Sequence, residues 1–136
     1  VKKICDRFGD ANLKGKKFGV WGLSFKPRTD DMREAPSIVI VNSLIEYGAE
    51  VVAYDPESEI SAKRIFGNKI RLVKKSYDAL DDADALIVIT EWNEFREPDF
   101  DRMRKLMRNP IIFDGRNLFS VEQMQAQGFE YISIGR

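Results

Sequence analysis

Short apolar runs alternate along this chain with stretches in which apolar residues recur every three or four positions. The runs predict strands, and the spaced pattern predicts helices that bury one face. The predicted strands are 18–21, 51–54, 70–73, 85–89, 111–113 and 129–134, and the predicted helices are 36–47, 58–66, 76–82, 98–108 and 120–127.

This alternation of strands and helices is typical of an α/β fold. We predict a Rossmann-like, doubly wound, mostly parallel sheet of six strands with helices on both faces. The run 85–89 is apolar throughout, which favours a central strand covered on both sides. In such folds the carboxyl ends of the strands meet at one edge of the sheet, where ligands bind.

The first eight residues predict the end of a helix. Val1, Ile4, Cys5 and Phe8 have the spacing of one helical face, and no capping residue precedes them. We interpret residues 1–12 as the tail of a helix between two domains, and residues 13–136 as one domain.

The composition excludes several kinds of chemistry. The 136 residues include 22 basic and 22 acidic side chains, so no net charge attracts nucleic acid or a membrane surface. The chain has no histidine, which excludes Ser-His-Asp catalysis and HExxH zinc sites, and its single cysteine excludes an internal disulfide. This cysteine usage fits a reducing compartment, and we expect a cytoplasmic protein with no nucleic-acid or membrane partner.

The first strand-to-helix turn matches a dinucleotide-binding turn only in part. That turn requires GxGxxG, whereas only Gly19 and Gly22 are present here, and Lys26 follows where the helix should already run. Asp55 also lies later than the acidic residue that usually follows such a turn by about 20 residues. We therefore predict that this domain does not hold NAD in its own crevice.

The connection 22–35 carries the first candidate binding residues. It is longer than the roughly two to six residues that such turns usually take. Lys26, which follows Phe25, and Arg33 are cations suited to a phosphate or an oxyanion. A salt-bridged surface loop is the alternative. We predict no metal site, because the adjacent Asp30-Asp31 pair cannot fill a coordination shell.

Arg116 is the second candidate. It follows the strand 111–113 directly and so belongs to the same edge as the long connection, where we expect it to face the ligand that Lys26 meets. The alternative is a turn with a solvated Arg116.

Two further segments are predicted to be structural. We expect Trp92 and Phe95 to anchor their loop in the core rather than to frame a ligand. The acidic stretch 81–84 is interpreted as a solvated turn before a strand.

Four motifs, taken in order, are similar to those of one enzyme family. The first resembles the loop that opens the C-terminal domain of the nucleotide-sugar dehydrogenases; it comprises Phe25-Lys26-Pro27, Thr29, Asp31, Arg33-Glu34 and Pro36-Ser37. The others are Tyr54-Asp55-Pro56, Thr90-Glu91-Trp92 and Phe113-Asp114-Gly115-Arg116. From Lys14 onward the chain thus resembles the UDP-binding domain of the UDP-glucose/GDP-mannose dehydrogenase family, and is most similar to members that oxidise UDP-glucose.

The resemblance implies a reaction that this domain shares with a partner. UDP-glucose becomes UDP-glucuronate while NAD is reduced, and the catalytic cysteine and the main NAD site belong to an N-terminal part that this sequence lacks. The implied partners are UDP-glucose and that N-terminal part, in a homo-oligomeric parent. The chain alone is expected to be inactive.

The resemblance also implies roles for particular residues. Phe25 and Lys26 would line the sugar side of the cleft, with Lys26 stabilising negative charge during catalysis. Arg33 would reach the bound NAD, and Arg116 would hold the sugar end of the substrate.

Two alternatives remain open from the sequence. The chain is also compatible with the same domain of a dehydrogenase for GDP-mannose or a UDP-acetylamino sugar. It is compatible as well with a stand-alone nucleotide-binding module, although the missing start of helix 1–8 argues against this. A pure interaction domain gives no reason to gather Lys26, Arg33 and Arg116 at one edge.

Overall fold

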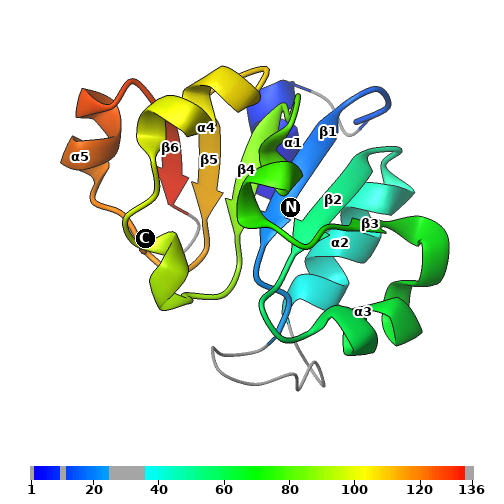
Figure 1. The fold of residues 1–136 in the computed structure, drawn as a ribbon. Helices are drawn as coiled ribbons and strands as arrows, with labels where there is room; N and C mark the ends of the chain where they lie inside the picture. Colours follow the sequence, from blue (N-terminus) through cyan, green and yellow to red (C-terminus); the bar gives the residue numbers. More distant parts are fainter. Residues whose placement is uncertain (1, 10–11, 25–35, 134–136) are drawn as a thin grey trace.

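Six parallel strands form the centre of the molecule in a computed structural model, which describes residues 2–9, 12–24 and 36–133. The strand order across the sheet is β3-β2-β1-β4-β5-β6, and every neighbouring pair is parallel (Figure 1). The strands are β1 (Lys17–Trp21), β2 (Glu50–Tyr54), β3 (Arg71–Leu72), β4 (Ala85–Val88), β5 (Ile111–Asp114) and β6 (Glu130–Ser133). The predicted doubly wound α/β fold is confirmed.

The helices also lie where the sequence pattern places them, with some differences in length and type. They are α1 (Lys2–Phe8), α2 (Pro36–Glu46), α3 (Glu59–Phe66), α4 (Phe100–Leu106) and α5 (Val121–Ala126). The segment predicted as helix 76–82 is a 3₁₀ helix over Ser76–Leu80, and two further 3₁₀ turns, Gly67–Lys69 and Asn93–Phe95, were not predicted. α4 begins later than predicted because the Asp99 side chain caps it by accepting the Arg102 N–H.

The four inner strands, β1, β2, β4 and β5, bury side chains on both faces of the sheet, and successive side chains alternate between the two faces. On β4, Ile87 packs in one core cluster, whereas Leu86 and Val88 pack in the other. The first cluster joins the sheet to α1, α2 and α3, and the second joins it to α4, α5 and the 3₁₀ helix 76–80. Helices therefore cover both faces of the sheet, which explains why 85–89 is apolar throughout.

The short helix α1 packs against the first of these core clusters. Ile4 is fully buried, and the Phe8 ring meets Phe18 edge-on at 5.6 Å between centroids. The Lys3 ammonium donates to the Ser133 carbonyl at 2.7 Å, and Arg7 pairs with Glu130, so α1 is also tied to β6. The predicted apolar face is thus confirmed for its described residues; Val1 lies outside them.

In the part of the chain that the structure describes, none of the helices has both the length and the apolar character needed to cross a bilayer.

Candidate functional site

The candidate site lies at the carboxyl edge of the sheet, where β1 and β4 are neighbours. The chain runs from β1 to β2 on one side of this point and from β4 to β5 on the other, so the strand order reverses direction here. Such a switch point leaves a crevice outside the strand ends, because the two following connections diverge. The connection between β1 and α2 begins at this crevice.

A buried carboxylate organises the start of that connection. Asp55, at the end of β2, accepts the backbone N–H groups of Leu23 and Ser24 on Oδ2, at 2.7 and 3.4 Å. Its Oδ1 accepts the N–H groups of Glu57 and Ser58, both at 2.8 Å. In a dinucleotide-binding turn, the N–H groups that follow the first strand point at the pyrophosphate. Here the chain's own carboxylate occupies them.

Two buried hydroxyls hold the carbonyl groups of the same segment. Thr90 Oγ1 donates to the Ser24 carbonyl at 2.7 Å, and Ser37 Oγ donates to the Leu23 carbonyl at 2.5 Å. Ser37 belongs to the first turn of α2, so its hydrogen bond joins the described residues on either side of 25–35. Together with Asp55, these groups fix where the chain leaves β1 and where it enters α2.

Gly19 and Gly22, the two glycines of this turn, allow other parts of the chain to pack closely against its backbone. A Cβ on Gly22, whose φ is +90°, would lie 2.5 Å from Thr90 Cβ. A Cβ on Gly19 would lie 2.3 Å from the Ala79 carbonyl oxygen. Both contacts are far shorter than a carbon side chain allows. The structure therefore requires these two glycines for packing, whether or not a ligand approaches them.

Arg116 lies at the same edge, and its side chain is anchored. Its Nε donates to the Ile89 carbonyl at 2.9 Å, and its backbone N–H is accepted by Asp114 Oδ1 at 2.8 Å. A crevice of about 200 Å³ lies beside it, lined by Pro36, Ile40, Ile87, Val88, Ile89, Gly115 and Arg116. The Arg116 side chain is therefore half-buried and anchored, rather than fully solvated as in the alternative interpretation.

The structure tests only part of the predicted set of site residues. Phe25, Lys26 and Arg33 lie outside the described residues, so their positions remain predictions. Pro36, at the start of α2, lines the same crevice as Arg116. The described end of the long connection and Arg116 thus meet at one edge of the sheet.

Tyr54 also lies at this edge, and nothing in the sequence pattern indicated a role for its hydroxyl. Its hydroxyl lies 3.2 Å from both carboxylate oxygens of Glu94, and its ring meets Phe95 edge-on. Burial and, after it, the charge of Glu94 raise the pKa of Tyr54 to about 12. The phenol therefore stays neutral at physiological pH and acts as a hydrogen-bond donor. Its place at the end of a strand, just before Asp55, was the available signal.

The predicted anchoring role holds for Phe95, which is fully buried and stacks on Trp21 at 4.8 Å between ring centroids. Trp92 packs against the same core cluster but is only half-buried. Its indole N–H is the one buried side-chain donor without a hydrogen-bond partner among the described residues.

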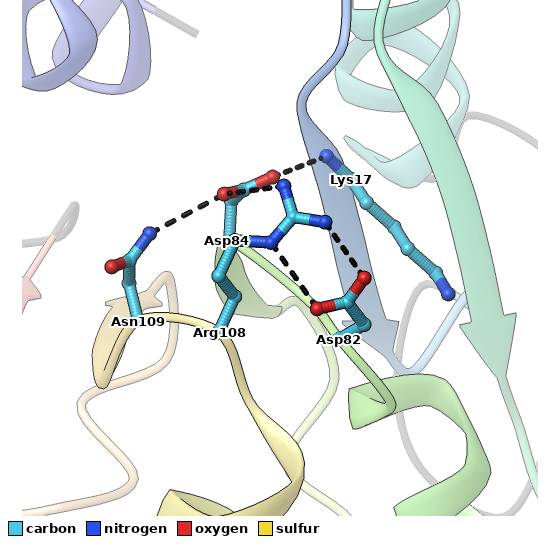
Figure 2. A network of polar contacts seen from close by, with 5 residues as sticks. All are labelled: Lys17, Asp82, Asp84, Arg108 and Asn109. Atoms are coloured by element: carbon cyan, nitrogen blue, oxygen red, sulfur yellow. Dashed lines mark hydrogen bonds and ion pairs between the residues drawn. The ribbon is translucent and has the colours of Figure 1, made fainter.

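The acidic stretch 81–84 lies at the opposite, amino edge, and its interpretation as a solvated turn is wrong for Asp84. Asp84 is 1% exposed and accepts the Lys17 backbone N–H at 2.8 Å and the Asn109 amide at 3.3 Å. Arg108 bridges it to Asp82, which it meets at 2.7 Å (Figure 2). This hydrogen bond lowers the pKa of the exposed Asp82. The network joins the starts of β1 and β4 to the end of α4.

The described residues contain no group of three or more side chains able to hold a metal ion.

Comparisons with known proteins agree on one family. Residues 19–121 match the model of the UDP binding domain of the UDP-glucose/GDP-mannose dehydrogenase family. The chain is 44% identical to a UDP-glucose 6-dehydrogenase of Rhizobium meliloti, with 99% of this chain and 30% of that protein covered. It is 43% identical to a UDP-glucose 6-dehydrogenase of Bacillus subtilis, with 100% of this chain and 29% of that protein covered.

Solved structures extend this likeness to the fold. A UDP-glucose dehydrogenase from Pyrobaculum islandicum superposes with a TM-score of 0.76 at 30% identity, over 98% of this chain and 28% of that one. A UDP-D-ManNAc dehydrogenase from Pyrococcus horikoshii gives 0.72 at 27% identity, over 99% and 29%. The chain thus spans less than a third of the length of each of these proteins.

Proposed function

The chain belongs to the UDP-glucose/GDP-mannose dehydrogenase family, and from this premise we propose that it is the C-terminal, UDP-binding domain of a UDP-glucose 6-dehydrogenase. In that role it helps to bind UDP-glucose and closes the cleft in which the sugar is oxidised to UDP-glucuronate. Residues 1–12, which include α1 (Lys2–Phe8), form the segment that leads into the domain, and residues 13–136 form the domain. The protein works in the cytoplasm, as part of a homo-oligomer.

The observation that carries this proposal is the anchored Arg116 beside the crevice at the switch point. An arginine held at Nε and at its backbone N–H is oriented before any ligand arrives. A guanidinium suits an oxygen-rich, anionic ligand such as a nucleotide sugar, because it donates several hydrogen bonds in a fixed plane. Preorganised donors of this kind lose little entropy on binding.

NAD supplies the hydride acceptor of the proposed reaction, but the crevice of this chain does not fit its pyrophosphate. The N–H groups of Leu23 and Ser24, which would receive it, are already paired with Asp55. We therefore assign the main NAD site and the catalytic cysteine to the N-terminal part of the enzyme. Arg33 contacts NAD from the side of this domain.

The residues of this chain stabilise charge and do not transfer protons. Lysine and arginine side chains remain protonated at neutral pH, so Lys26 and Arg116 act as electrostatic donors. Lys26 balances negative charge on the reacting sugar, Phe25 lines the sugar side of the cleft, and Arg116 holds the sugar end of the substrate.

A dehydrogenase for a UDP-acetylamino sugar is the second candidate, favoured by the structural likeness to the Pyrococcus horikoshii enzyme. The relatives named UDP-glucose 6-dehydrogenase are more similar in sequence, at 44% and 43% against 27% identity. This difference supports UDP-glucose as the first candidate.

Steady-state kinetics of the enzyme that contains this chain test the proposal. Arg116→Ala should raise the KM for UDP-glucose by about 10- to 100-fold, the effect of losing hydrogen bonds to a charged group. Arg64→Ala, which removes an exposed arginine of α3, is the matched control and should leave KM unchanged. Parallel assays with GDP-mannose and UDP-N-acetylmannosamine identify the preferred sugar. An unchanged KM in Arg116→Ala contradicts the assigned role.

A further inference from the structure

One buried carboxylate organises the turn that carries Arg116. Asp114 closes β5 and has no exposed surface. Its Oδ1 accepts the Arg116 N–H at 2.8 Å, and its Oδ2 accepts the N–H groups of Leu118 and Phe119 at 2.6 and 3.2 Å. The path of the backbone from Gly115 to Phe119 thus depends on the orientation of this carboxylate.

Among the residues that the structure describes, Tyr131 supplies the one side-chain donor to this carboxylate. It lies on the neighbouring strand β6, and its hydroxyl is 2.6 Å from Asp114 Oδ2. The same hydroxyl lies 3.0 Å from the Phe119 carbonyl, so it contacts the turn at both ends. The other donors to Asp114 are backbone N–H groups of the turn itself. A short hydrogen bond from a hydroxyl to an ionised carboxylate is among the stronger kinds in proteins.

We propose that Tyr131 is a positioning residue for substrate binding, which acts through Asp114 to orient Arg116. The hydroxyl holds the Asp114 carboxylate from the side of β6, while Oδ1 holds the backbone of Arg116. The second anchor of Arg116, from Nε to the Ile89 carbonyl, then directs the guanidinium along the crevice. This inference rests on the proposed function of Arg116 in holding the nucleotide sugar.

Without the hydroxyl, Asp114 Oδ2 keeps only donors that belong to the turn. The turn then keeps a tie to β6 from Ser133 Oγ to Asn117 Oδ1 at 2.6 Å, but the Asp114 carboxylate has lost its own hydrogen bond from β6 and can reorient. Arg116 would lose its preset orientation although its own side chain is intact. The expected defect is therefore in sugar binding and not in folding.

A double-mutant cycle in the full-length dehydrogenase tests the proposal. Tyr131→Phe removes only the hydroxyl and should raise the KM for UDP-glucose about tenfold, within the range of coupling between residues in one network. The KM for NAD should stay unchanged. In an enzyme that already carries Arg116→Ala, Tyr131→Phe should have no further effect on KM, because the residue that it orients is gone.

Tyr77→Phe is the matched control. It also removes one tyrosine hydroxyl from a hydrogen bond, the one that accepts the Asp99 N–H at 2.7 Å, but among the described residues this hydroxyl makes no hydrogen bond to the Asp114 turn. It should leave both KM values unchanged. Thermal melts of all variants show whether a kinetic change reflects unfolding.

The outcomes separate this proposal from the one on which it rests. If Tyr131→Phe raises KM equally with and without Arg116, or only lowers the melting temperature, the hydroxyl is merely structural and the positioning role is overturned. If Arg116→Ala itself leaves KM unchanged, the assigned function of Arg116 fails, and the role of Tyr131 fails with it.

Discussion

Three aspartates at strand ends show how a single carboxylate can shape a turn. Asp55 follows β2 and Asp114 ends β5 at the carboxyl edge, and Asp84 precedes β4 at the amino edge. Each is buried, and each accepts backbone N–H groups from a segment distant in sequence or from the turn that follows. Buried carboxylates persist only when they are paired in this way, because an unpaired buried charge is costly. These aspartates are therefore structural.

Lys26 is the residue with the sharpest expected effect on catalysis. Pro27 restricts its backbone dihedrals, and an ammonium held there stabilises charge on the reacting sugar. We expect Lys26→Ala in the full-length enzyme to lower kcat by about 10²–10³, the usual effect of losing one preorganised donor. The melting temperature should stay unchanged, because we expect Lys26 to act on the substrate and not in folding, and substitutions away from structural features usually alter stability by less than about 0.5 kcal/mol.

Lys26→Arg is the matched variant and should restore little activity, since a planar guanidinium does not replace a compact ammonium. Steady-state kinetics and a thermal melt measure both effects. A Lys26→Ala enzyme with near-normal kcat, or one that is inactive only because it unfolds, would show that the residue is structural.

At the scale of elements, the connection between β1 and α2 depends on contacts with three other segments. Its described ends are held by Asp55 after β2, by Thr90 after β4 and by Ser37 within α2. A long connection loses conformational entropy when its ends are brought together, and these hydrogen bonds offset that loss.

Ser37→Ala tests this arrangement. The substitution leaves the buried Leu23 carbonyl without its hydroxyl donor, and we expect the free energy of unfolding to fall by about 1–3 kcal/mol. Ser43→Ala, on the same helix, makes the same chemical change in a half-buried serine and should be close to neutral. Urea denaturation of the 136-residue chain measures both. Equal midpoints for the two variants would show that the Ser37 hydrogen bond contributes nothing.

At the scale of the whole molecule, the chain has a complete core but lacks the groups for its proposed reaction. Helices cover both faces of the sheet, and each face has its own buried cluster. The single cysteine, Cys5, is partly buried against the first cluster, and the sequence has no histidine.

We therefore expect the isolated chain to unfold cooperatively but not to reduce NAD in the presence of UDP-glucose. Circular dichroism during urea denaturation tests the first part, and the absorbance of NADH tests the second. Turnover that survives both repeated purification and Cys5→Ser would contradict the assignment of the catalytic groups to a different part of the enzyme.

The sequence by itself determined the elements and their order, and it predicts the edge at which a ligand binds. The period of two on strands and of 3.6 on helices is a local property, so it can be found without knowing which segments touch. The strand 85–89, the helix 36–47 and the place of Arg116 after a strand were all predictable for this reason. The motifs from Phe25 to Arg116 pointed to the family for the same reason, because they depend only on residue type and order.

Only the tertiary structure decided what the polar residues contact. Asp55 meets Leu23 across 32 positions, Asp84 meets Lys17 across 67, and Tyr131 meets Asp114 across a strand pair. Nothing in the local pattern distinguishes a carboxylate that orders a turn from one that faces solvent, which is why the prediction failed for Asp84. Burial and hydrogen-bond partners arise only when distant segments pack together, and they also made Tyr131 a candidate that the sequence alone did not suggest.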